Sequence, residues 1–304
     1  MPGQPGIVFD HDTCTGCELC VRSCPTDSIE LRESLAHLNG ELCIRCGHCQ
    51  AICPVEAVSS AIENPISSPF ETFVPDARWL PYGEADVPAV VRLLASRRSC
   101  RNFTEEAVDT AVLRDLVRIG IMAPSAGNFQ LWTFTLVPDR ASVMALVHRI
   151  AGAYRRLCRL SDRSILRTVL KLVGKGDLDY FHRVYKTWME VRLAEWEGGG
   201  RDPFFRGAPA AIVIGSKPGG SRPGDDAFMA SQNVLLAAHA MGLGTCLVGM
   251  AVVAMDFDRS IRDMIGVPSE ESLHAVIAVG HPDELYLSLT GRSEPELRTW
   301  RPGE

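Results

Sequence analysis

The chain has 304 residues, of which 46% are hydrophobic and 22% charged, and its formal net charge is −6. This length suits one small module and one full domain, and the acidic balance argues against nucleic acid as a partner. The apolar runs are interrupted before the roughly 18 consecutive residues that a membrane span needs, and residues 1–6 lack the features of an export signal. We therefore expect a cytoplasmic protein without a transmembrane segment.

Eight of the eleven cysteines lie in two matching runs near the N-terminus. Residues 14–25 and 43–54 each read C-x2-C-x2-C-x3-C-P, and the second run repeats the first 29 residues later. In bacterial two-cluster ferredoxins, the fourth cysteine of each such run ligates the other run's cluster. The pattern therefore predicts two [4Fe–4S] clusters, one bound by Cys14, Cys17, Cys20 and Cys53 and the other by Cys43, Cys46, Cys49 and Cys24.

Structural zinc and disulfide bonds are the alternative uses of such cysteines. A zinc site takes four ligands but has no C-x3-C-P tail, and disulfides belong to oxidising compartments. The remaining Cys100, Cys158 and Cys246 are odd in number, which fits reduced thiols. We keep the cluster interpretation.

The cysteine module is predicted to span residues 1–60, with short strands at 6–10 and 28–32. Residues 61–86 are rich in proline and show little periodicity, which predicts an extended linker. Its length allows the module to lie over this chain's own second domain or over a neighbour's.

From residue 87 to 304, helical and strand patterns alternate, which predicts an α+β domain. Gly242 and Gly266 stand where helix ends favour a positive φ. The expected helices cover 87–99, 107–122, 140–150, 225–241 and 256–265, and the expected strands cover 131–137, 210–215, 245–250 and 274–279.

A helical insertion is expected at about residues 154–206. Basic residues recur there every three or four positions, at Arg156, Arg159, Arg163, Arg167 and Lys171, which predicts one basic stripe. The stripe is either the solvated face of a lid helix or a docking strip for an acidic redox partner or a membrane surface. Aromatic residues of the insertion serve either its own core or the roof of a substrate pocket.

Three stretches of the larger domain carry potential binding chemistry. Residues 97–101 (RRSCR) bring together guanidinium groups that match phosphate and carbonyl edges. Residues 123–130 (APSAGNFQ) form a loop of small residues and amides, and residues 242–249 place glycines around a buried strand. Together these features indicate a site for a flat, phosphorylated ligand.

Taken together, residues 87 to about 300 resemble the FMN-dependent nitroreductase family, and the whole chain is similar to its ferredoxin-fused branch. The resemblance implies a two-cluster ferredoxin fold followed by a nitroreductase-like α+β sandwich, in a homodimer with FMN at the subunit interface. Leu131 and His281 depart from the residues that the family commonly has at these positions, proline and tyrosine.

The resemblance also implies which residues bind FMN. Arg97, Arg98, Ser99 and Arg101 would hold its phosphate, ribityl chain and pyrimidine edge. Ser125 and Asn128 would contact the flavin of the partner subunit. The backbone of Leu247, Val248 and Gly249 would lie along the ring system, and Arg292 would close on the phosphate. No side chain is expected to act as an obligate acid or base, because the flavin carries the chemistry.

A chain with both cofactors is expected to pass single electrons from the clusters to FMN, which delivers a hydride to a small acceptor. A nitroaromatic, a quinone and an activated alkene remain open as acceptors, and reduced ferredoxin and NAD(P)H as donors. Two other functions stay open: a relay of electrons between protein partners, and an FMN dehydrogenase that drains electrons through the clusters.

Overall fold

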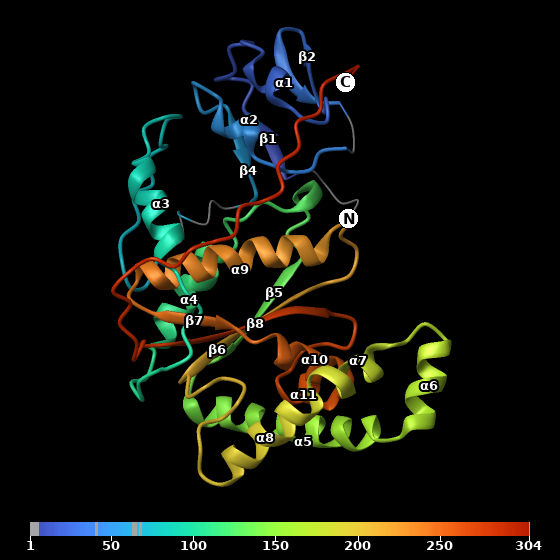
Figure 1. The fold of residues 1–304 in the computed structure, drawn as a ribbon. Coiled ribbons are helices and arrows are strands. Elements are labelled where there is room, and N and C mark those ends of the chain that lie inside the picture. Colours follow the sequence, from blue (N-terminus) through green and yellow to red (C-terminus); the bar gives the residue numbers. More distant parts are fainter. Residues whose placement is uncertain (1–5, 40–41, 63–65, 67–68, 304) are drawn as a thin grey trace.

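The computed structural model describes residues 6–39, 42–62, 66 and 69–303. Its N-terminal module pairs β1 (Ile7–Phe9) with β4 (Val58–Ser60), and β2 (Ile29–Arg32) with β3 (Leu35–Leu38), both antiparallel. Helices α1 (Leu19–Ser23) and α2 (His48–Ala51) each contain a cysteine of one run. The two pairs and two helices enclose a small core that includes six of the eight module cysteines. The ribbon of this module is blue in Figure 1.

The chain after the module is anchored to the larger domain by a buried carboxylate. Asp115 is fully buried on α4 (Thr110–Gly120), where it accepts hydrogen bonds from the backbone of Glu71 and from the backbone and hydroxyl of Thr72. Glu71 also binds Arg114 with both carboxylate oxygens, and Phe70 is buried beside them. Because part of the proline-rich stretch is fixed here, the free tether to the module is shorter than the sequence suggested.

The larger domain is built on a four-stranded antiparallel sheet with the order β5-β6-β8-β7. The strands are β5 (Trp132–Val137), β6 (Ala210–Ser216), β7 (Gly244–Leu247) and β8 (Ser272–Gly280). Every residue of β6 is buried, and its side chains alternate between two cores, with Ile212 and Ile214 in one and Ala211 and Val213 in the other. A strand with both faces covered needs apolar residues at consecutive positions, which explains its sequence AAIVIGS.

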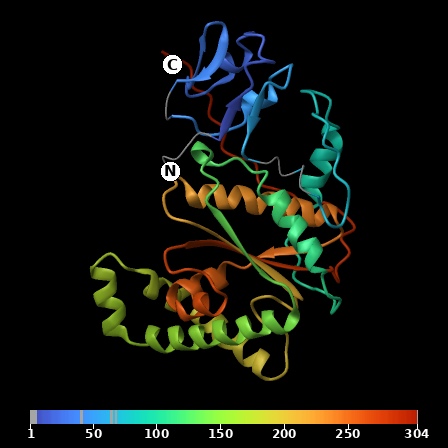
Figure 2. The ribbon, with the colours of Figure 1, turned by 180° about the vertical axis from the view of Figure 1, so that it is seen from behind.

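Two layers of helices cover the sheet. On one face lie α4 and α9 (Pro223–Ala240), with α3 (Val87–Ser96) against α9; on the other lie α5 (Arg140–Ser161), α10 (Gly249–Phe257) and α11 (Ser260–Met264). Figures 1 and 2 show these layers from opposite sides. Side chains of Asp86, Asp109 and Asp139 accept from the first turns of α3, α4 and α5, so each helix begins at an N-cap that the sequence provides. Residues 281–303 contain no helix or strand, and they run past α9 to the cysteine module (Figure 1).

Several predicted element boundaries are wrong. The helix expected to end at residue 150 continues to Ser161, because Tyr154 and Cys158 extend its buried stripe into the core. The strand expected to end at residue 250 ends at Leu247, and α10 begins at Gly249; the helix predicted at 256–265 is the end of α10, a break at Asp258, and α11. The positive φ predicted for Gly242 and Gly266 is confirmed, at 79° and 71°.

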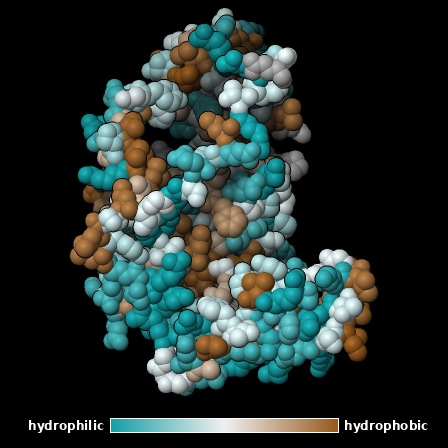
Figure 3. All heavy atoms as spheres, viewed as in Figure 1, coloured by the Kyte–Doolittle hydropathy of each residue, from teal (hydrophilic) through white to brown (hydrophobic). Residues whose placement is uncertain are grey.

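The single basic stripe predicted for residues 156–171 is also wrong. The helix is interrupted between Ser161 and Ser164, where α6 (Ser164–Leu172) begins. Arg156 pairs with Asp258, the residue after α10, whereas Arg167 and Lys171 both pair with Asp179 of α7 (Asp177–Val184). Helix α6 projects from the domain (Figure 1), and its exposed apolar side chains are brown in Figure 3. Helix α8 (Lys186–Glu197) then returns the chain to the core. Among the described residues, no helix is long and apolar enough to cross a membrane.

Candidate functional site

The first set of predicted cluster ligands surrounds its own cavity. Cys14, Cys17, Cys20 and Cys53 all line it, although Cys53 is distant in the sequence from the other three. Cys14 and Cys17 come from the turn that leads into α1, Cys20 lies in the first turn of α1, and Cys53 follows α2. Gly16 has a φ of 64°, and a Cβ there would meet the carbonyl oxygen of Ser34 at 2.2 Å, so only glycine lets this turn close.

The second set surrounds a separate cavity in the same way. Cys43, Cys46, Cys49 and Cys24 line it, and Cys24 comes from the end of α1. The structure thus brings together the crossed sets of four that the repeat predicts. Within the described residues, no three or more His, Cys, Asp or Glu side chains are arranged to hold a single metal ion; each set of four thiols instead lines a cavity.

The fourth cysteine of each run occupies the same polar environment. The sulfur of Cys24 accepts from the backbone N–H of Ser28 at 3.2 Å, and the sulfur of Cys53 accepts from the N–H of Ala57 at 3.2 Å. Burial opposes ionisation at Cys24, but hydrogen bonds from Thr26 and Ser28 outweigh it and lower the pKa of this thiol. Burial raises the pKa of Cys49 to about 11. Because ligating thiols must be deprotonated, metal binding has to displace a proton at Cys49.

The predicted flavin residues 97–101 run from the end of α3 to the edge of the sheet. Ser99 forms a parallel bridge with Thr245, and the N–H of Cys100 donates to the carbonyl of Thr245 at 2.8 Å. Arg97 is half-buried, and its guanidinium makes no hydrogen bond or ion pair with any described residue. Burial, together with the charges of Arg292 and Arg98, lowers the pKa of Arg97. These partly buried guanidinium groups repel one another and have no carboxylate partner at Arg97. An anion such as the FMN phosphate would neutralise their charge.

A second basic group surrounds Cys246 on β7. Burial raises the pKa of this thiol, and it outweighs the positive charges of Arg101, Arg206 and Arg97, which act to lower it. Sequence reasoning missed Arg206. Its backbone is held by the buried Asp202, which accepts from the N–H groups of Phe205, Arg206 and Gly207 and pairs with Arg140. An Asp followed closely by Arg-Gly is a turn signal in the sequence, but nothing there indicates that the turn faces β7.

The predicted ring-binding backbone lies next to this basic group. Leu247 is half-exposed at the end of β7, Val248 is buried, and Gly249 is the first residue of α10. A Cβ at Gly249 would meet no heavy atom within 4 Å. The space above this backbone is therefore not filled by the chain itself, which fits a flat ring laid against it.

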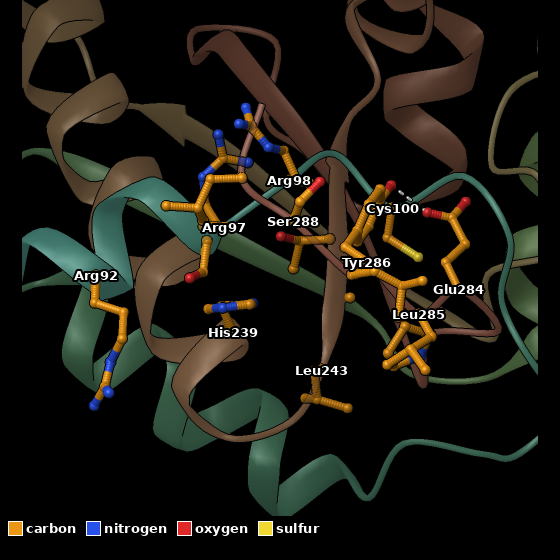
Figure 4. Close-up of a pocket in the computed structure, with 16 residues that line it drawn as sticks. Arg92, Arg97, Arg98, Cys100, His239, Leu243, Glu284, Leu285, Tyr286 and Ser288 are labelled. Carbon is orange, nitrogen blue, oxygen red and sulfur yellow. Dashed lines mark hydrogen bonds between the residues drawn. The ribbon is translucent and has the colours of Figure 1, made fainter. Parts of the chain in front are cut away.

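A cavity of about 490 Å³ lies where the C-terminal segment passes the arginine stretch (Figure 4). Arg97 and Arg98 line it with residues 284–289, whereas Ser99, Arg101 and Arg292 lie outside its wall. Arg98 donates to the carbonyl of Thr290 at 2.9 Å, which fastens the segment to the arginine stretch. The tail therefore positions Arg292 so that its charge lowers the pKa of Arg97, although almost 200 residues separate the two in the sequence.

The remaining predicted flavin residues, Ser125 and Asn128, lie elsewhere in the chain. Ser125 accepts from the N–H of Gln130 at 3.0 Å, and the N–H of Ala126 donates to the buried Asp226 at 2.9 Å. The amide of Asn128 donates to the backbone of the cysteine module rather than toward the arginine cluster. Within one chain, the structure does not bring this loop to Arg97.

Comparison with known proteins identifies both parts. Residues 94–281 match the model of the nitroreductase family, which is more than half of the chain. The chain belongs to the nitroreductase family. Residues 6–54 of this family member match a 4Fe-4S dicluster domain. It carries an iron–sulfur domain and is an FMN-dependent oxidoreductase, with FMN and two [4Fe–4S] clusters as its cofactors.

Among its relatives, an iodotyrosine deiodinase of Thermotoga neapolitana is 26% identical over 63% of this chain and 88% of its own length. An NADH dehydrogenase of Thermus thermophilus is 25% identical over 66% of this chain and 91% of its own length. The crystal structure of a nitroreductase with bound FMN from Bacteroides fragilis superposes with a TM-score of 0.50 at 22% identity, covering 69% of this chain and 97% of that one. This similarity shows that the nitroreductase fold is shared.

Proposed function

We propose that this nitroreductase-family member passes electrons from two [4Fe–4S] clusters to FMN, which delivers a hydride to a small acceptor such as a nitroaromatic, a quinone or an activated alkene. Two one-electron donations and one solvent proton balance each hydride. The observation that carries the proposal is that two four-cysteine cavities and a nitroreductase domain occur in one chain. We divide the chain accordingly into a cluster domain at 1–60, a linker at 61–86, and the FMN domain at 87–304 with its helical insertion at about 154–206.

In this proposal the chain's own residues bind and orient the cofactors. Arg97, Arg98 and Arg292 hold the phosphate, and Ser99 and Arg101 hold the ribityl chain and pyrimidine edge. The backbone at 247–249 supports the ring. The eight cysteines of the two cavities hold the clusters, and the backbone N–H groups of Ser28 and Ala57 donate to the sulfurs of Cys24 and Cys53.

We further propose a homodimer that completes the flavin site with Ser125 from the partner. Exposed apolar side chains support it. Val87 and Val91 on α3 are more than half exposed, and Leu285 and Leu287 of the C-terminal segment are 86% and 92% exposed. Apolar side chains that gather on a protein surface can mark an interaction site, and we propose a second copy of the chain as the cover for these ones.

The donor is either reduced ferredoxin or NAD(P)H. A cluster domain suits a one-electron protein donor, whereas the name of the Thermus relative supports a nicotinamide. Anaerobic assays with each donor alone separate the two, because only a productive donor bleaches the clusters.

The test of the proposed function is anaerobic purification with iron, sulfide and flavin analysis, followed by stopped-flow reduction. We expect about eight irons and one FMN per chain. Cluster bleaching should precede flavin bleaching, and a nitroaromatic or quinone should reoxidise the flavin. Flavin that is never reoxidised by a small molecule would instead favour a relay between proteins. Reduction of the clusters by a substrate through the flavin would favour a dehydrogenase.

A further inference from the structure

An amide side chain of the FMN domain contacts the cluster module. The Nδ2 group of Asn128 donates to the carbonyls of Ile44 at 3.0 Å and Arg45 at 2.9 Å. These two residues lie between the predicted ligands Cys43 and Cys46. Carbonyls only accept, so both N–H bonds of the amide must face them, and its oxygen accepts from the amide of Gln130 at 2.9 Å.

The FMN domain holds Asn128 ready for this contact. Asn128 has a φ of 54°, a left-handed backbone that asparagine tolerates better than most residues. The loop around it is fixed by the bond from the Gln130 N–H to Ser125 and by the bond from the Ala126 N–H to the buried Asp226. The amide therefore projects from a braced loop, so little ordering entropy is lost when it binds.

The tether limits where the module can go. Between Ser60, the end of β4, and Phe70, which is buried beside the Asp115 anchor, the chain spans at most about 35 Å. In Figures 1 and 2 the green segment that contains Asn128 lies directly under the blue module, and α2 lies nearer to the FMN domain than α1 does. The Asn128 contact and the short linker to the Asp115 anchor are far apart in the sequence. Both place the same side of the module against the FMN domain.

We propose that Asn128 is a docking residue that seats the loop between Cys43 and Cys46 on the FMN domain. Docking turns the site of Cys24, Cys43, Cys46 and Cys49 toward this domain and leaves the site of Cys14, Cys17, Cys20 and Cys53 facing outward. On the proposed function, on which this order rests, the outward site receives each electron from the donor and the seated site passes it on. Both N–H groups of the Asn128 side chain donate to the cysteine module, so neither is available to the flavin.

The test compares two substitutions that suit a left-handed backbone. Asn128→Asp keeps the size of the side chain but turns a donor toward two carbonyls into an acceptor, and Asn128→Gly removes the side chain without straining φ. Gln50→Ala is the matched control. Gln50 is exposed and lies next to the predicted ligand Cys49, and the side-chain amide of Gln50 makes no hydrogen bond with the described residues. Iron and FMN contents are measured for all variants.

The first readout is hydrogen–deuterium exchange in the oxidised holoprotein. Loss of two hydrogen bonds should raise exchange in residues 42–47 by about tenfold or more in both Asn128 variants, with Gln50→Ala unchanged. The second is the rate of flavin bleaching after cluster reduction, which should fall by about tenfold while iron and FMN contents stay at wild-type levels. Unchanged exchange in residues 42–47, or loss of FMN with an unchanged bleaching rate, would overturn the docking role. If exchange rises but the clusters of the wild type never reduce the flavin, docking stands and the proposed function fails.

Discussion

Removal of the Asp115 carboxylate should release the linker from the FMN domain. This group is fully buried, and it accepts bonds of 2.9 and 2.8 Å from the N–H groups of Glu71 and Thr72 and of 2.6 Å from the Thr72 hydroxyl. Hydrogen bonds to a charged group contribute about 1.5–3 kcal/mol each but are not additive. Asp115→Ala also leaves the two N–H groups without acceptors, so we expect a loss of about 3 kcal/mol in linker docking, or about a hundredfold in the docking equilibrium.

Hydrogen–deuterium exchange of residues 69–73 measures this loss directly, and limited proteolysis of the linker supports it. Thr72→Val removes only the hydroxyl and should cost about 1–2 kcal/mol. Asp76→Asn is the control, because Asp76 pairs with Arg78 in solvent within the same linker and should leave linker exchange unchanged. Wild-type exchange in Asp115→Ala, or an equal loss in Asp76→Asn, would refute the anchor.

The same anchor should depend on pH. Burial acts to raise the pKa of Asp115, but the hydrogen bonds from Thr72 and Glu71 outweigh it, so the folded pKa is lowered. A lowered folded pKa means that the carboxylate stabilises docking fully above its unfolded pKa of about 3.9 and loses this contribution as pH falls through the folded value. Linker exchange, corrected for its intrinsic pH dependence, should therefore rise only below about pH 4 in the wild type and show no such step in Asp115→Ala.

Three further predictions concern the cofactor sites. Arg97→Ala should weaken FMN binding by about 10- to 100-fold, since it removes a charge-assisted contact, while iron content stays at the wild-type level; an unchanged Kd in flavin titration would contradict the phosphate role. Gly249→Val should leave the melting temperature within about 2 °C, because the added side chain starts in open space, yet it should weaken FMN binding; full affinity would show that the ring lies elsewhere. Cys53→Ala and Cys24→Ala should each lose about half of the iron, and electron paramagnetic resonance of the reduced protein should show different surviving clusters, whereas loss of the same cluster in both would contradict the crossed ligand sets.

The sequence alone was sufficient for the parts of this protein whose chemistry depends on local spacing. The two cysteine runs predicted the cluster module, because three ligands of each cube lie within seven residues and the fourth is marked by the same repeat. The alternating apolar patterns predicted most strands and helices of the α+β domain, and three capping aspartates mark helix starts. The family resemblance is confirmed, and nine of the ten flavin residues that it implied remain predictions. We assign the tenth, Asn128, to the cysteine module instead.

Only the tertiary structure decided where distant segments meet. The sequence did not show the extra turns of α5, because they depend on burial against a core that other elements build. Nor did it show the break after Ser161, which divides the basic residues between α5 and α6. It likewise did not reveal that the charge of Arg206 acts on Cys246 of β7, that Asp115 binds the linker, or that Asn128 donates to the loop before Cys46. These interactions join residues 40 to 83 positions apart, and polar side chains carry no periodic signal for such partners. Periodicity reports which face of an element is buried, but only the folded chain determines which residues each face meets.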